Sequence, residues 1–143
     1  MQEVICGYLT DNVKLVKIKD HTAAGTATLT SSEVDARGYS RALFFTSFGT
    51  AAANNLITVH QGAAASGEAA SVALKASGTS DEDVMIDIRV NPAYPFLTLV
   101  ASCGTSTTCE SMWVLLYNAR EKNQSSTLSG TAIVAQFDSP ALA

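Results

Sequence analysis

Residues 41–48 read Arg41-Ala42-Leu43-Phe44-Phe45-Thr46-Ser47-Phe48, and this stretch decides the fold class. A short apolar and aromatic run of this kind is typical of a β-strand. Phe44 and Phe45 are adjacent, so in a strand their side chains must point to opposite faces. One ring therefore enters a core, while the other needs a second layer, a neighbouring subunit or solvent.

Eight further segments have strand-like composition and are separated by short connections. A chain built this way predicts an all-β fold, an antiparallel β-sandwich or barrel, with little helix. The eight segments are residues 12–19, 26–30, 56–61, 72–75, 84–90, 96–101, 112–117 and 132–137. The strongest helix candidate, residues 63–76, is interrupted by Ser66-Gly67, and the gaps between strands rarely leave room for the helices of an α/β fold.

The length and composition describe one weakly charged domain. The chain has 143 residues, of which 47% are hydrophobic and 15% charged, and a domain of this size buries enough surface to fold without disulfides or metal. We assign residues 1–12 to an N-terminal arm or first edge strand and residues 13–143 to a single β-sandwich domain. Ala, Ser and Thr account for 52 of the 143 residues, and surfaces rich in such small side chains lose little entropy when another protein covers them.

The charge and hydropathy patterns exclude several classes of partner. The formal net charge is −4 and no basic run is present, so we expect no nucleic-acid partner. The longest apolar runs have six residues, far fewer than the ~20 that cross a bilayer, so we expect no membrane partner. The first residues carry no positively charged region, so we expect synthesis in a reducing cytoplasm without a signal peptide.

Three cysteines, Cys6, Cys103 and Cys109, are an odd number and argue against a disulfide framework. Cys103 and Cys109 flank residues 104–108, which we interpret as a hairpin loop. A disulfide across such a loop is the alternative to free thiols, which we favour.

No arrangement of residues predicts catalysis, and we expect no enzyme activity, metal or cofactor. The two histidines, His21 and His60, stand without a nucleophile motif or a zinc-ligand spacing. The acidic group at residues 81–83 lacks the alternating ligands of a calcium loop, and we interpret it as a solvated turn. Trp113 lies in the apolar run at residues 112–117, which favours a core position. The alternative is a sugar-stacking platform with Tyr94 or Tyr117.

Several strings resemble small proteins encoded beside the major capsid gene in tailed bacteriophages, over about residues 12–135. These strings are residues 14–21, 23–26, 44–50, 80–83, 86–88, 104–108 and 129–131. The resemblance implies a capsid decoration (cement) protein with a jelly-roll or related β-sandwich fold. It also implies a homotrimer on the outer surface of the phage head, bound to the major capsid protein, and therefore a virion location.

The resemblance supplies no catalytic residues, so candidate contact residues come from the apolar pattern. The segment Val4 to Leu9 is too apolar for a free tail, and it packs either on the capsid or a sister subunit or in the ordinary core. The candidate interface residues are Val4, Ile5, Tyr8, Leu9 and Phe45. A carbohydrate- or receptor-binding β-sandwich of a virion, or a minor head or tail structural protein, is the alternative function.

Overall fold

The computed structural model describes residues 12–53, 55–67, 70–76 and 80–119, with residues 70–76 described by their backbone. All regular elements in these ranges are β-strands, and the predicted all-β class is confirmed. Eight of the nine predicted strand segments overlap observed strands. The ninth, residues 132–137, lies outside the described residues, as do residues 1–11.

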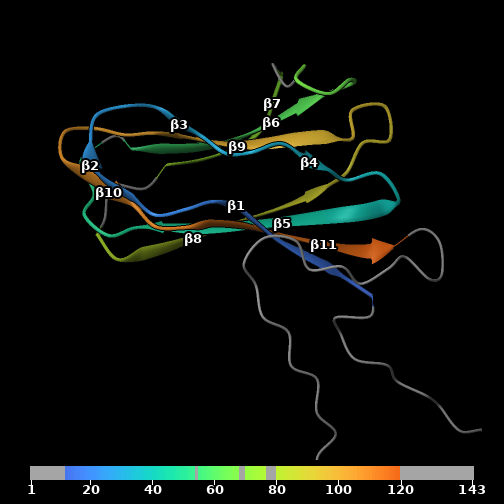
Figure 1. Cartoon of the computed structure of the whole chain (residues 1–143), viewed down its shortest axis with the longest axis horizontal. Helices are drawn as coiled ribbons and strands as arrows, with labels where there is room; N and C mark the ends of the chain where they lie inside the picture. The colour runs from blue at the N-terminus through green and yellow to red at the C-terminus, as the bar shows by residue number, and fades with distance from the viewer. Residues whose placement is uncertain (1–11, 54, 68–69, 77–79, 120–143) are drawn as a thin grey trace, which may run out of the picture.

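Two antiparallel sheets form the two layers in Figure 1. Sheet A contains β1 (Lys14–Lys19), β2 (Thr22–Gly25), β5 (Tyr39–Phe48), β8 (Glu82–Arg89), β10 (Thr107–Cys109) and β11 (Met112–Ala119). Sheet B contains β3 (Leu29–Thr30), β4 (Val34–Asp35), β6 (Leu56–Gly62), β7 (Ala70–Ala76) and β9 (Phe96–Ser102). The strand β7 replaces the weak helix candidate at residues 63–76.

Three consecutive strand pairs each behave as one interrupted strand. β1 pairs with β11 and β2 pairs with β10, so the two lie along the same edge. β3 and β4 both pair with β9, and β10 and β11 both pair with β5. Counting each pair once, sheet A has the order β1/β2, β10/β11, β5, β8, and sheet B has the order β3/β4, β9, β6, β7. This order of eight strands in two sheets is that of a jelly roll.

The core lies between the sheets, and buried residues alternate with partly exposed ones over residues 42–48 of β5 and 112–117 of β11. Phe44 and Phe48 of β5, and Val114 and Leu116 of β11, are almost completely buried. They pack against Ile57, Leu97 and Leu99 from sheet B. Of the adjacent phenylalanines, Phe44 faces this core and Phe45 faces outward, as strand geometry predicts.

The segment between Cys103 and Cys109 is not a hairpin loop, and that prediction is wrong. β9 ends in sheet B at Ser102, and β10 starts in sheet A at Thr107, so the segment crosses between the sheets. The buried Asn55 holds this crossover, because its Oδ1 accepts a hydrogen bond from the backbone N–H of Gly104 at 2.7 Å. A Cβ at Gly104 would lie 2.6 Å from the Cβ of Ala52, so the crossover is closely packed.

The described residues include no helix that is long and apolar enough to cross a membrane.

Candidate functional site

The outward surface of sheet A carries several aromatic and aliphatic side chains and is the candidate site. We call it the outer A face. Along β5, β8 and β11, alternate residues are buried, and their neighbours, together with Leu15 and Lys17 of β1, form this face. Its members are Leu15, Lys17, Arg41, Leu43, Phe45, Ser47, Asp83, Met85, Asp87, Arg89, Trp113, Leu115 and Tyr117.

The strand registers arrange these side chains in rows that run across the sheet. Lys17, Trp113, Phe45 and Met85 form one row, and Leu15, Leu115, Leu43 and Asp87 form the next. Side chains directly opposite one another on neighbouring strands are in contact range. The two rows therefore form a continuous apolar strip, in which Met85 is 67% exposed and the other apolar side chains are partly exposed.

Trp113 has an interacting neighbour on each side within its row. Its ring lies parallel to that of Phe45, at an interplanar angle of 3° and a centroid distance of 6.4 Å. From the strand on the other side, the Lys17 ammonium lies 5.9 Å from the indole centroid, within cation–π range. Trp113 is thus an outward-facing residue rather than the core residue that its apolar run predicts.

Charged side chains lie at the two ends of the outer A face. Asp83 and Glu110 lie at one end, where they line a shallow hollow of about 350 Å³ together with Phe45 and Trp113. Arg41 and Arg89 are register partners at the other end. The face therefore has an acidic end and a basic end, and the two rows between them are apolar except for Lys17 and Asp87 at their edges.

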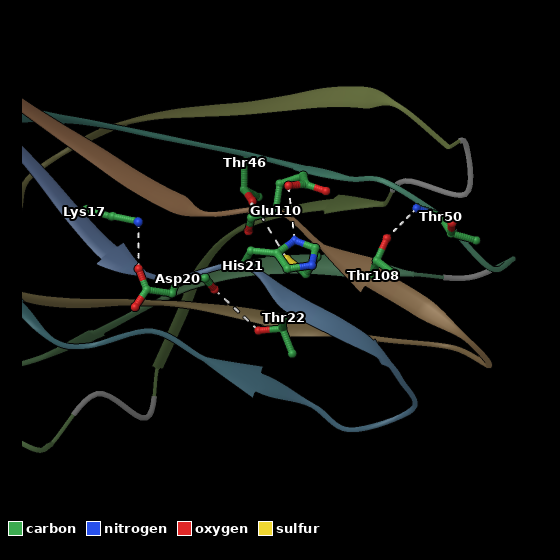
Figure 2. Close-up of polar contacts among 9 residues, drawn as sticks. Lys17, Asp20, His21, Thr22, Thr46, Thr50, Thr108 and Glu110 are labelled. Carbon is green, nitrogen blue, oxygen red and sulfur yellow. Dashed lines mark hydrogen bonds and ion pairs between the residues drawn. The ribbon is translucent and has the colours of Figure 1, made fainter. Parts of the chain in front are cut away.

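A second polar cluster lies at the turn between β1 and β2 (Figure 2). The Lys17 ammonium is 2.7 Å from the Asp20 carboxylate, and its hydrogen bond and positive charge lower the pKa of Asp20. His21 Nδ1 lies 3.2 Å from Glu110 Oε2, with both side chains about half exposed. Residues 17–22, with Thr30 and Ser32, surround an open hollow of about 450 Å³. Among the described residues the His21 ring bonds only to Glu110, so the cluster joins the strand turn to the end of β10.

The two described cysteines are free thiols. Cys109 is buried and Cys103 partly buried, and burial raises the pKa of both thiols. The structure thus has the arrangement favoured over a disulfide. In the part of the chain that the structure describes, no three acidic, histidine or cysteine side chains gather in a way that could hold a metal ion.

Of the predicted interface residues, Phe45 lies at the centre of the outer A face. Val4, Ile5, Tyr8 and Leu9 lie outside the described residues. Sequence reasoning missed Leu43, Met85 and Leu115 as surface residues. An available signal was the apolar side chain at almost every position of residues 112–117, since a strand that is apolar on both faces must contact something on both.

No protein-family model matches the chain, and no curated protein is similar to it. Among solved structures, the chain is similar to a protein from a study of Bacillus endospore appendages, described as a novel family of disulfide-linked pili. That match has 11% identity and a TM-score of 0.46, and it covers 82% of this chain and 98% of the other. Chains from infectious bursal disease virus of the Gt and Gx strains match at 13% identity and a TM-score of 0.41. These matches cover 77% of this chain, which spans about a third of the viral chains. At these values the matches carry no conclusion about function.

Proposed function

We propose that this protein is a structural virion protein, a decoration (cement) protein that binds the outer surface of a phage head. The observation that carries the proposal is the outer A face, an apolar sheet surface on a jelly-roll sandwich. The sequence resemblance described above supports the same function. The partner is the major capsid protein, and the expected assembly on the shell is a homotrimer.

A decoration protein stabilises the shell through mass action. A subunit that binds the assembled shell but not its separated parts shifts the equilibrium toward the assembled state. Trimerisation adds to this effect, because several weak contacts made together give a large avidity. Such a protein needs rigid surfaces suited to protein contact rather than a catalytic pocket.

The outer A face has the composition of a protein-contact surface. Aromatic residues, Met and Arg are enriched at protein interfaces, and this face contains Phe45, Trp113, Met85, Arg41 and Arg89. The largest apolar patch on a monomer is often a functional contact surface. The face therefore favours a protein that works in contact with other proteins.

The function is tested by mixing the purified chain with expanded, undecorated shells of its phage and sedimenting the shells. We expect the chain to pellet with the shells and the shells to resist heating better once decorated. The chain alone and shells alone serve as controls. A chain that stays in the supernatant at saturating concentration would overturn the proposal.

The N-terminal arm is tested in the same assay. Removal of residues 1–10 is expected to abolish shell binding while the urea unfolding transition is retained. Full binding by the shortened chain would show that Val4, Ile5, Tyr8 and Leu9 are not shell contacts.

A further inference from the structure

Two opposite charges on the outer A face lie equally far from its middle. On the edge strand β8, the outward residues are Asp83, Met85, Asp87 and Arg89 in that order. Asp83 and Arg89 are equally far from the point midway between Met85 and Asp87, and they carry opposite charges. Neither side chain has a hydrogen bond or ion pair with a described residue.

We propose that the outer A face packs against the outer A face of a second copy of this chain, related by a two-fold axis that runs across the strands. This rotation reverses the strand direction, so Asp83 of one copy lies over Arg89 of the other, and the pair occurs twice. Contacts of this isologous kind are the commonest in homo-oligomers. The proposal rests on the proposed function for its setting, a virion on which the outer A face contacts protein, and it identifies that protein as a second copy of this chain rather than the shell.

The opposite charges of Asp83 and Arg89 distinguish this axis from the alternative. A two-fold axis parallel to the strands through the middle of the face would also bring two copies face to face, but it would lay β8 of one copy over β1 of the other. Asp83 and Arg89 would then face β1 rather than each other. Only the axis across the strands lays β8 over β8 and brings these opposite charges together.

The apolar rows match under the same rotation. The row that contains Phe45 and Trp113 lies over the row that contains Leu43 and Leu115 of the other copy. Met85 lies over Asp87 of the other copy, beside the Asp83–Arg89 pair. Two aligned sheets that face each other in this way interleave their side chains as the two layers of a sandwich do.

The size of the face indicates a weak contact in solution. Four strands about 4.8 Å apart and six residues at about 3.3 Å each give a surface of roughly 15 by 20 Å. Stable complexes bury about 800 Å² on each partner, so pairing of free chains should depend on concentration. On a virion the copies are held close together, which turns a weak contact into a persistent one. Because a two-fold contact joins copies in pairs, it links either two chains or two trimers.

The pairing is tested without shells by sedimentation equilibrium of the full chain from about 1 µM to about 1 mM, a range that covers weak contacts. We expect the mass to rise with concentration toward two times 14.9 kDa, or toward six times if trimers form in solution. A mass of one or three chains over the whole range would overturn the pairing. Shell binding is measured separately, so the proposed function can fail while pairing holds, and the reverse.

Charge exchange tests the arrangement of the two copies. Asp83→Arg and Arg89→Asp should each weaken pairing at least about tenfold, because each variant places like charges together twice. The double variant Asp83→Arg/Arg89→Asp restores opposite charges and should pair within about threefold of the original chain. Arg37→Asp is the matched control, since Arg37 lies in the loop before β5 and not on the face. Failure of the double variant to pair would overturn the two-fold arrangement.

Met85 gives a second and independent test, because it is exposed and tolerates substitution. Because Met85 lies over Asp87 of the other copy, Met85→Glu should weaken pairing by bringing two negative charges together, and Met85→Lys should preserve it. Equal loss with both variants would overturn the predicted register.

Deletion of residues 1–11 tests for a different occupant of the face. If this deletion alone abolishes association, the face binds the arm of another copy, and face-to-face pairing is wrong.

Discussion

The hydroxyl group of Tyr117 donates a hydrogen bond to the carboxylate of Asp87, with O–O distances of 2.6 and 2.8 Å to its two oxygens. Tyr117 lies on β11 and Asp87 on β8, and β5 separates the two strands. The contact thus spans the middle strand of sheet A on its outer side. It lies beside Arg41 at the basic end of the outer A face, where the apolar strip ends.

This contact makes the ionisation of Tyr117 sensitive to Asp87. The hydrogen bond to Asp87, desolvation and the negative charge raise the pKa of Tyr117 above its usual value near 10. A raised folded-state pKa means that the contact stabilises the fold below the unfolded pKa and is lost as pH rises through the folded pKa. Asp87→Asn should lower the pKa of Tyr117. The shift is measured as the phenolate absorbance difference between each protein and its Tyr117→Phe derivative. Asp83→Asn is the control, and an equal shift with that variant would contradict the assignment.

The two adjacent phenylalanines should differ in their contribution to stability. Phe44→Ala removes a ring that is 1% exposed in the core and should cost about 3–5 kcal/mol. Phe45→Ala removes a partly exposed ring and its stacking with Trp113, and should cost about 1–2 kcal/mol. Urea unfolding at low protein concentration, where copies do not pair, gives both values. Similar losses for the two variants would contradict the outward position of Phe45.

The strands rich in β-branched and aromatic residues were predictable from the sequence. Residues 41–48 and 96–101 nearly coincide with β5 and β9, because their β-branched and aromatic content agrees with their tertiary position. The outward position of one ring of the pair Phe44 and Phe45 follows from strand geometry alone. The jelly-roll order came from the resemblance and not from periodicity, since pairing partners are set by contacts between distant residues.

Three features could not be predicted, each for a local reason. β2 has the sequence Thr22-Ala23-Ala24-Gly25, whose small residues give little strand signal, and it exists because it pairs with β10. The run at residues 112–117 is apolar on both faces, which conceals the outward direction of Trp113. The turn residues at 104–108 suit a hairpin and a sheet crossover equally, and only the sheet partners of β9 and β10 distinguish the two.

The crossover itself should depend on Asn55. Its side chain is fully buried, with Oδ1 accepting from the Gly104 N–H and Nδ2 lying 3.2 Å from Thr107 Oγ1. Asn55→Ala leaves these buried groups without partners and should cost about 2–4 kcal/mol in unfolding free energy. Thr107→Val keeps the shape and the Gly104 hydrogen bond, so about 1 kcal/mol is expected. Urea denaturation compares them, and a smaller loss for Asn55→Ala than for Thr107→Val would contradict this role.

The thiols beside this crossover should react at different rates in the folded protein. The thiolate is the reactive form, and burial raises the pKa of both Cys103 and Cys109. Cys109 is only 1% exposed, whereas Cys103 is partly exposed. Alkylation followed by peptide mass mapping should therefore modify Cys109 at least about tenfold more slowly than Cys103 under native conditions. In denaturant the two rates should become similar, which is the internal control. Recovery of a Cys103–Cys109 cross-linked peptide from protein kept unreduced would contradict the free thiols and show that the crossover is closed covalently.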